Sequence, residues 1–579
     1  MKTWDWVIIG GYCILITFVG LIFRKRAEGG VEDFFLSGRN LPWWLAGTSL
    51  VATSFASDTP LFVTGLVRNH GISGNWHWWF MALASVASLF FFARLWRRSK
   101  IITDMEFIEL RYGPGAGAVL RGAKAVFMGI FFNIYALGAW PVLGLTKVLE
   151  VATDWSKGFA VLFCAVLALT YSIFSGLWGV VATDFIQFFF ALGGAVLLAI
   201  FAVRAMGGLL IFWEKVQYLP QADFLPTHTP ESFWNSPWIF FLSLILIQWW
   251  ARGVEGDGIA VQRLSACKDE KHSFFAMLWF NIAHYALRPW PWIIVALTSI
   301  ILLPEVTNSL GVVDHEMAYP SMILLLMPSG LKGLMIASFF AAFMSTVDTH
   351  LNWGSSYVVN DLYRRFVNRD AEPTHYVWVG RLVTLFMMVG GGIIAFTTSS
   401  IVEAFYNVLL LFSGVGLVGI ARWFWWRINA WSEITAMLAS GLLTLLASPI
   451  ATTLGWPDER PIHLIIVVTF STVIWLSVTL LTRPTHEKHL KLFYERVRPT
   501  GPGWEPIAAV SSEVSSKDSL KNNSWGWVMG VLFILGTTIA IGKGMLGFWL
   551  ECLIATGFAT VGLLGVRKTI IKMIWSKEA

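Results

Sequence analysis

Three acidic residues lie inside long apolar stretches of the sequence, where their chemistry suits ion or solute binding. They are Asp58, Asp184 and Asp348, and no Lys or Arg lies within one helical turn of any of them. A charge at membrane depth is expensive, and it usually marks an ion path, a proton relay or a substrate site. Without a cationic partner, each carboxylate is expected either to take up a proton or to bind a cation.

The stretch around Asp58 is predicted to interrupt a helix. Residues Ser49 to Pro60 are mostly small and polar, and the stretch ends at the proline. Proline lacks a backbone N–H and disfavours helical backbone at the residue before it. We therefore expect an unwound segment whose carbonyl oxygens are free to bind an ion. The alternative is an unbroken helix that packs closely through its small residues.

The stretch around Asp348 places hydroxyl groups on one face of a helix. At about 100° per residue, one arc of that helix contains Ala342, Ser345, Thr346 and Thr349. Na⁺ is a hard cation that prefers oxygen ligands, and carbonyls of an unwound neighbour would complete the shell that one helix face cannot close. The alternative is that these hydroxyls bond back to carbonyls of their own helix. For Asp184, the alternative is a structural hydrogen bond to a neighbouring hydroxyl.

The composition indicates that membrane-spanning helices position these side chains. Hydrophobic residues make up 56% of the 579 residues and charged residues 13%, about half of the roughly 25% typical of soluble domains. The mean hydropathy is +0.64. These values exclude a soluble enzyme, a disordered protein and a nucleic-acid-binding protein. The net charge of +6 is assigned to basic cytoplasmic loops, and no GxxxxGK[ST] loop for ATP hydrolysis occurs.

Stretches of roughly 20 apolar residues predict an all-α polytopic membrane protein with about fifteen transmembrane spans. In chain order, spans 1 to 15 are predicted at residues 5–23, 44–67, 76–97, 121–147, 157–175, 178–205, 236–254, 272–303, 331–360, 377–399, 403–424, 432–452, 462–482, 525–543 and 546–566. Basic residues gather in alternate loops, beginning with Arg24, Lys25 and Arg26. The positive-inside rule then places the N-terminus outside and the C-terminus in the cytoplasm of a plasma or inner cell membrane.

The chain is predicted to divide into three parts. Residues 1–482 form the core with flanking helices, and residues 525–579 form two accessory spans with a cytoplasmic tail. Between them, residues 483–524 form a cytoplasmic linker that is first basic and then Ser-rich, a composition typical of disorder.

Several short segments resemble the sodium/solute symporter family, which includes bacterial proline, galactose and sialic-acid symporters and glucose cotransporters. They recur in family order over about residues 5–480, and they are specific only together. The segments are Asp33 to Arg39, Glu106 to Gly113, Thr183 to Gln187, Val261 to Leu264 and Ala342 to Thr346, which runs on to Asp361-Leu362-Tyr363.

The resemblance implies a LeuT-like core with Na⁺ as the coupling ion. Two inverted five-helix repeats would cover about residues 44–205 and 236–424, each with a broken first helix. One Na⁺ site would lie between spans 2 and 9. Its ligands would be the carbonyls of Ala52, Phe55 and Ala342 and the hydroxyls of Ser345 and Thr346.

The resemblance also implies a possible second cation site near Asp184. Its partner positions in span 9 are Ser345, Asp348 and Thr349. Relatives with a second Na⁺ carry hydroxyls at these positions, so Asp348 is a departure. Two carboxylates near one ion would raise a carboxyl pKa and favour H⁺ in place of the second Na⁺.

The solute is expected near the membrane midplane, between the broken stretches of spans 2 and 7. The residues at those positions are Asp58, Thr59, Trp249, Trp250 and Gly253. An indole surface suits a sugar face or a cation, and Asp58 suits an amino, quaternary ammonium or hydroxyl group. The alternative is that Asp58 caps the amides of its own helix break. Glu255 and Asp257 are assigned to the cytoplasmic end of span 7.

The sequence therefore predicts Na⁺-coupled symport of a small polar organic solute, such as a sugar, an amino acid or a related compound, by alternating access. The alternative is a solute sensor or channel-like protein on the same fold that does not transport. No enzyme motif is found. The expected partners are the solute and the lipid bilayer, with no nucleic acid, and the sequence leaves the oligomeric state open.

Overall fold

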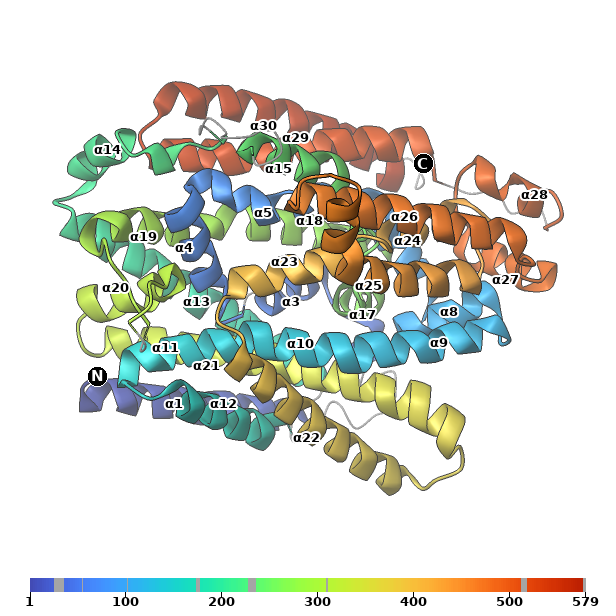
Figure 1. Cartoon of the computed structure of the whole chain (residues 1–579), viewed down its shortest axis with the longest axis horizontal. Coiled ribbons are helices and arrows are strands. Elements are labelled where there is room, and N and C mark those ends of the chain that lie inside the picture. The colour runs from blue at the N-terminus through green and yellow to red at the C-terminus, as the bar shows by residue number, and fades with distance from the viewer. Residues whose placement is uncertain are drawn as a thin grey trace.

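The computed structural model describes residues 1–24, 36–54, 56–101, 103–172, 177–226, 236–308, 311–511 and 518–575. Within these ranges all regular elements are helices, apart from two isolated β-bridges. Most of the long helices lie along the longest axis of the molecule (Figure 1). The all-α architecture agrees with the sequence prediction.

The first half of the chain begins with α1 (Thr3–Arg24) and a divided second span. That span consists of α3 (Trp43–Thr53) and α4 (Thr59–His70), so the predicted interruption before Pro60 is confirmed. The following helices are α5 (Trp76–Trp79), α6 (Met81–Ala87), α7 (Ala93–Ser99), α8 (Asp104–Tyr112), α9 (Ala116–Val126), α10 (Asn133–Leu137), α11 (Leu143–Thr153), α12 (Lys157–Ser172) and α13 (Leu177–Ala205). Short π-helical turns join α6 to α7 and α9 through α11 into long continuous spans.

The second half repeats this order after α14 (Leu209–Gln217). Its first span is also divided, into α15 (Pro237–Ser243) with α16 (Trp249–Ala251) and, beyond a break, α17 (Gly258–Ala266). The following helices are α18 (Glu270–Asn281), α19 (Pro289–Leu302), α20 (Ala318–Leu326), α21 (Leu331–Ser356), α22 (Pro373–Thr397), α23 (Ile401–Phe412) and α24 (Gly416–Phe424). Both predicted repeats therefore begin with a broken helix.

The C-terminal part contains two pairs of long helices separated by a short helical segment. The long helices are α25 (Ala430–Thr453), α26 (Arg460–Leu481), α29 (Leu520–Met545) and α30 (Trp549–Ile570), and the segment holds α27 (Glu487–Val497) and α28 (Glu505–Ala508). The hairpin of α29 and α30 lies along one edge of the bundle, opposite α1, α12 and α22 (Figure 1).

The linker between residues 483 and 524 is not disordered where the structure describes it. Phe493 and Trp504 are buried and stack on each other, with ring centroids 5.4 Å apart. Asp518 forms ion pairs with Arg94 and Arg98 at 2.9 and 3.0 Å. Phe493 also contacts Phe107 and Trp423 of the core. The prediction of disorder was wrong for the described part of the linker, because composition does not register such contacts.

Ten helices among the described residues are long and apolar enough to cross a membrane, or eleven if the pair α23 and α24, bent by 44°, is one span. The predicted number of about fifteen is not confirmed by this count. When the bent pair is counted as one span, four of the predicted spans are missing from the count of eleven. They correspond to α1, to α12 and to the two broken spans. In the broken spans each helical piece is short, which physically explains why length alone does not identify them.

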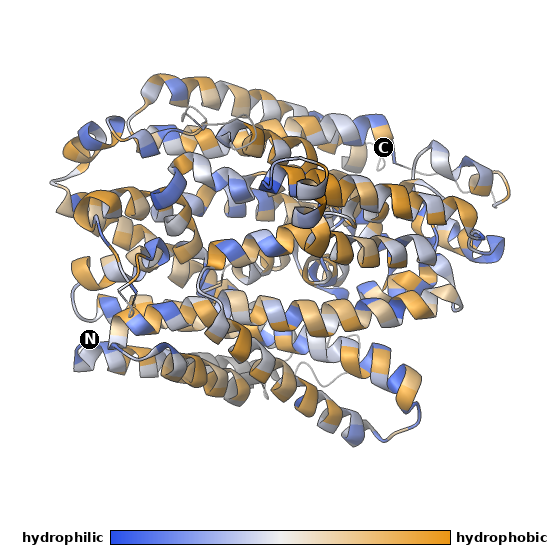
Figure 2. Cartoon of the chain, in the orientation of Figure 1, coloured by the Kyte–Doolittle hydropathy of each residue, from blue (hydrophilic) through white to orange (hydrophobic). Residues whose placement is uncertain are grey.

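The helices at the margins of the bundle consist largely of hydrophobic residues (Figure 2), and many of their hydrophobic side chains are exposed. Among them are Leu445 and Leu481, which are 79% and 86% exposed. Such surfaces are unfavourable in water and suit contact with lipid. The multi-pass membrane assignment therefore agrees with the surface as well as with the composition.

Candidate functional site

The breaks of the two divided spans face one cavity of about 520 Å³. Residues from both breaks line it, including Asp58 and Thr59 from the first and Gly253 from the second. Gly253 has φ of +121°, a backbone conformation that favours glycine. The cavity volume is in the range of sites for small organic molecules.

Arg288 holds the end of α3 where the first break begins. This residue lies in the middle of the long span formed by α18 and α19, and it is 2% exposed. Its guanidinium donates hydrogen bonds to the carbonyl oxygens of Val51 at 2.8 Å and Ser54 at 3.0 Å. A cationic side chain thus satisfies carbonyls that the break releases from the helix.

The segment between α3 and α4 also packs closely against α11. Ser57 donates a hydrogen bond to the carbonyl oxygen of Pro141 at 2.8 Å. A β-carbon at Gly144 would lie 2.5 Å from the backbone nitrogen of Asp58, so only glycine allows this approach. The break is therefore fixed by packing as well as by Arg288.

The predicted Na⁺-binding hydroxyls lie at the junction of α3, α13 and α21. Ser345 donates a 2.5 Å hydrogen bond to one carboxylate oxygen of Asp184, and Ser49 donates to the other at 2.7 Å. The hydroxyl of Thr346 is buried and has no partner among the described residues, and Thr346 lines the cavity. Neither hydroxyl of this pair in α21 bonds back to its own helix.

The three carbonyl positions of the predicted Na⁺ site are only partly described. Ala52 and Ala342 are buried, at 4% and 3% exposed, on α3 and α21, which pack against each other. Phe55 lies outside the described residues. The structure therefore brings together four of the five predicted residues on two adjoining helices.

Asp184 has a cationic neighbour that the sequence interpretation did not identify. Arg263 donates to the hydroxyls of Ser49 at 3.4 Å and Thr53 at 3.2 Å, and both hydroxyls lie within hydrogen-bonding distance of Asp184. Arg263 belongs to α17, beyond the second break. It was placed outside the membrane because span 7 was expected to end near residue 254.

The residues of the possible second cation site are buried, and two of them, Asp184 and Ser345, are joined by a hydrogen bond. The hydroxyl of Thr349 has no partner among the described residues. The Oδ1 atom of Asp348 accepts a hydrogen bond from Asn352 at 3.1 Å. Asp184 accepts hydrogen bonds from Ser345, one of the predicted partners, and from Ser49, and the hydroxyl bonds are also those expected of a structural lock.

Asp58 precedes α4 without capping it. Its side chain makes no capping hydrogen bond, and its Oδ1 atom is buried without a partner among the described residues. The charges of Asp58 and Arg288 are close enough to interact. The hydroxyl of Thr59 accepts a hydrogen bond from the backbone N–H of Ala56 at 3.3 Å, which closes the turn before α4.

The two predicted tryptophans of span 7 lie in different environments. Trp249 lines the cavity and stacks on Trp527 of α29, with centroids 5.1 Å apart and planes at 25°. Trp250 is not among the residues that line the cavity. Its indole donates to the carbonyl oxygen of Leu246 at 2.7 Å and packs beside Leu464.

The accessory helix α29 therefore reaches the predicted solute site. It packs against α6 and the π-helical turn Ile282–Leu287. The indole of Trp527 donates to the carbonyl oxygen of Leu83 at 2.9 Å, which fixes the ring behind Trp249. The sequence interpretation gave α29 no role, because no local motif reports a contact between segments so distant in sequence.

Glu255 and Asp257 lie in the break of the second divided span, where Glu255 is partly buried and Asp257 is exposed. Glu255 is ion-paired with Arg422 at 2.8 Å and hydrogen-bonded to the indole of Trp423. Asp257 caps α17 by accepting from the backbone N–H of Ala260 at 2.8 Å. Their assignment to the cytoplasmic end of span 7 is corrected, since the helix resumes at Gly258.

At the opposite end of the bundle, a second ionic cluster joins α11, the loop before α20 and α23. Glu316 accepts from Lys147 at 2.6 Å, from the Ser400 hydroxyl at 2.9 Å, and from the N–H groups of Ile401 and Val402 at 3.1 and 3.0 Å. We call Lys147, Glu316 and the first turn of α23 the outer latch. It fixes the start of α23 beside α4.

A model of the sodium:solute symporter family matches residues 34–439 of the chain. The sodium/glucose cotransporter of Vibrio parahaemolyticus is 26% identical over 468 residues, which is 75% of this chain and 83% of that protein. A sodium/mannose cotransporter of Bos taurus is 26% identical over 510 residues, which is 79% of this chain and 81% of that protein.

The fold also matches a solved structure described as the substrate-bound outward-open state of a Na⁺-coupled sialic acid symporter. The TM-score is 0.66 at 22% sequence identity, and the match covers 84% of this chain and 99% of the other. This likeness supports the predicted LeuT-like arrangement of two inverted repeats, whose broken first helices are α3 with α4 and α15 through α17.

Proposed function

The chain belongs to the sodium:solute symporter family, and on that basis we propose that it carries a small polar organic solute by alternating access. It is a multi-pass membrane protein that couples solute symport to Na⁺. Because the relatives are named for glucose and mannose, polar solutes such as sugars, amino acids and related compounds are the class to test. A transporter needs no catalytic group, and none is assigned.

The observation that carries the proposal is the position of Thr346. Its buried hydroxyl lacks a partner among the described residues, faces the cavity, and lies beside Ser345 on a helix that packs against the broken span. Oxygen ligands of this kind suit Na⁺. We propose that Na⁺ binds there, with carbonyls of Ala52, Phe55 and Ala342 as its remaining ligands.

For the second cation site we propose that Asp184 serves mainly in a hydrogen-bond network and binds a second Na⁺ only weakly. Both of its oxygens already accept hydrogen bonds from Ser49 and Ser345, and Arg263 supplies nearby positive charge. A carboxylate whose negative charge is already stabilised by hydrogen bonds and a nearby cation gains less from binding an ion. The neighbouring Asp348 and Thr349 remain the candidate partners if a second ion binds.

For the solute we propose contacts with Asp58, Thr59, Trp249 and Gly253, which share the cavity. Trp250 was predicted with them, and its contacts outside the cavity favour a structural role. Alternating access requires the cavity to communicate with one side at a time. The positive-inside pattern favours a cytoplasmic C-terminus, so we propose that the outer latch lies on the outside.

The test is solute accumulation by the purified chain in proteoliposomes with an imposed Na⁺ gradient. We expect accumulation against a solute gradient that collapses when Na⁺ is equalised or replaced by K⁺. A sensor would bind solute without accumulating it, and a channel-like protein would only equilibrate it. Either result would overturn the proposal of symport.

A further inference from the structure

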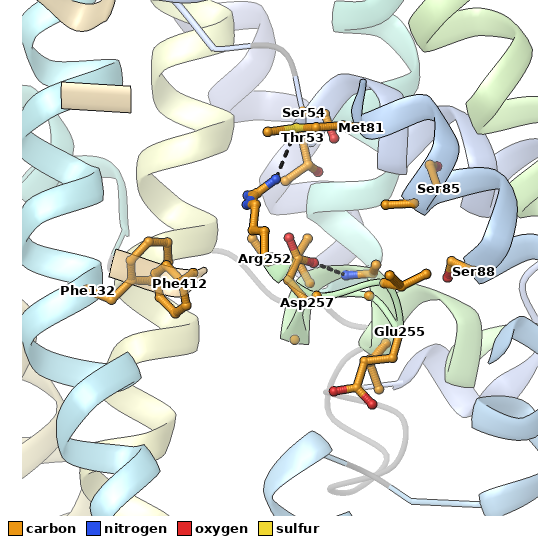
Figure 3. A pocket seen from close by; sticks show the side chains of 18 of the residues that line it. Thr53, Ser54, Met81, Ser85, Ser88, Phe132, Arg252, Glu255, Asp257 and Phe412 are labelled. Carbon is orange, nitrogen blue, oxygen red and sulfur yellow. Dashed lines mark hydrogen bonds between the residues drawn. The ribbon is translucent and has the colours of Figure 1, made fainter. Parts of the chain in front are cut away.

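Arg252 places a guanidinium in the cavity without a carboxylate partner. It lies in the break between α16 and α17 and lines the cavity. Among the described residues it makes one hydrogen bond, from Nη1 to the thioether sulfur of Met81 at 3.0 Å. A guanidinium carries five N–H donors, and a thioether is a weak acceptor. Figure 3 shows the side chain extending from the break toward Met81.

Three arginines near this cavity are buried, and each has strong acceptors. Arg288 donates to two backbone carbonyls, and Arg422 is ion-paired with both Glu255 and Glu433. Arg263 donates to the hydroxyls of the Asp184 network. Arg252 therefore differs from its neighbours in having donors to spare.

The acidic side chains near Arg252 have other hydrogen-bond or ion-pair partners. Asp257 is close enough for its charge to interact with Arg252, but it caps α17 and forms no ion pair with Arg252. Glu255 bonds to Arg422 and Trp423. In Figure 3 the carboxylate of Glu255 points away from the head group of Arg252.

Arg252 is partly buried, and a guanidinium that is partly removed from water without an anionic partner is unfavourable. Its planar fork matches a carboxylate in a bidentate geometry. We propose that the transported solute carries a carboxylate group, which Arg252 binds. This inference rests on the proposed symport and names the class of solute within it. The unpartnered Oδ1 atom of Asp58 in the same cavity suits hydroxyl or ammonium donors on the rest of that solute.

The test uses matched pairs of compounds that differ in the carboxylate. Glucuronate is compared with glucose, galacturonate with galactose, and proline with prolinamide, each with and without Na⁺. The readouts are thermal stabilisation of the purified full chain and competition for Na⁺-driven uptake. We expect the carboxylate member of at least one pair to act at concentrations tenfold or more below those of its neutral partner.

Variants then assign the selectivity to Arg252. Arg252→Gln should abolish the preference for the carboxylate member, and Arg252→Lys should retain part of it because it keeps the charge without the fork. Arg204→Gln, at an exposed position on α13, should leave the preference unchanged. Equal action of both members of every active pair would overturn the inference, as would a preference that survives in Arg252→Gln.

A second measurement needs no ligand. If Arg252 serves the solute, the solute-free protein should keep or gain stability on Arg252→Met, because a partly buried charge without an anionic partner is removed. A fall of several degrees in its melting temperature would show a structural role and overturn the inference. Loss of all Na⁺-driven accumulation in the parent protein would instead overturn the proposed symport, so the two failures are distinguishable.

Discussion

The guanidinium of Arg288 donates a 2.8 Å hydrogen bond to the backbone carbonyl oxygen of Val51, at the point where the first broken helix ends. The same side chain donates to the carbonyl of Ser54 at 3.0 Å. Two carbonyls on either side of Ala52 are thereby fixed by one residue from a different helix. The carbonyl proposed to bind Na⁺ lies between them, so its direction depends on Arg288.

We expect Arg288→Lys to weaken Na⁺ binding by about tenfold or more. Lysine keeps the charge but presents a point charge rather than a fork that can bridge two carbonyls. Na⁺ affinity is measured from thermal stabilisation in a titration at constant ionic strength. Arg381→Lys, at an exposed position on α22, is the matched control. An unchanged Na⁺ affinity in Arg288→Lys would show that the break is held by packing alone.

The break itself could be predicted from the sequence, because its causes are local. Small polar residues before Pro60 weaken the helix wherever the chain goes. The hydroxyl face of α21 also follows from the helical period alone. Long apolar stretches also predicted the ten or eleven helices that are long and apolar enough to cross a membrane.

The partners at the break could not be predicted, because they come from distant parts of the chain. Arg288, Arg263 and Trp527 reach the site from three other helices, and none carries a local signal of that contact. The one available signal was an arginine in the middle of the apolar stretch 272–303. A search restricted to acidic residues at membrane depth passes over it.

Thr346 offers a direct test of the Na⁺ site. Thr346→Val removes a hydroxyl that loses no hydrogen bond in the ion-free protein, so we expect Na⁺ affinity to fall by tenfold or more without loss of basal stability. Linkage requires solute affinity to fall at fixed Na⁺ and to recover when Na⁺ is raised. The measurement is solute uptake as a function of Na⁺ concentration.

Ser345→Ala should weaken Na⁺ binding and also lower stability, because this hydroxyl bonds to Asp184. The control is Ser338→Ala on the same helix, where the buried hydroxyl, among the described residues, bonds only to the carbonyl of Met335. Unchanged Na⁺ dependence in the Ser345→Ala and Thr346→Val double variant would remove these residues from the site.

Trp527 links the accessory hairpin to solute binding. Trp527→Ala removes the ring stacked behind Trp249, and an aromatic pair contributes about 1 kcal/mol beyond its buried area. We expect solute affinity to fall about fivefold at saturating Na⁺, with little change in Na⁺ affinity. Trp525→Ala, on the same helix but 53% exposed, is the control. Equal effects of both substitutions would mean that α29 acts only through general stability.

The outer latch is expected to stabilise one conformation of the transporter, and a matched pair of substitutions can test its effect. Glu316 uses both carboxylate oxygens, one toward Lys147 and Ile401 and the other toward Ser400 and Val402. Gln replaces one oxygen with an NH₂ group, which would then face donors. We expect Glu316→Gln to release the start of α23 and to raise the population of the outward-open state.

Asp314→Asn is the control for this shift. Among the described residues, Asp314 bonds to Lys147 at 2.6 Å and to the backbone N–H of Glu316 at 3.1 Å, but not to α23. The reporter is the variant Phe405→Cys, because the ring of Phe405 on α23 packs on Phe62 of α4, with centroids 4.9 Å apart. The measurement is the rate at which a membrane-impermeant thiol reagent, added outside, labels this cysteine. Glu316→Gln should increase that rate severalfold and Asp314→Asn should not.

Since Na⁺ would reach its site from the outside, Glu316→Gln should also bind Na⁺ more tightly, as expected when a binding-competent state becomes more populated. Faster labelling without tighter Na⁺ binding would mean that the latch closes the outside without being coupled to the ion.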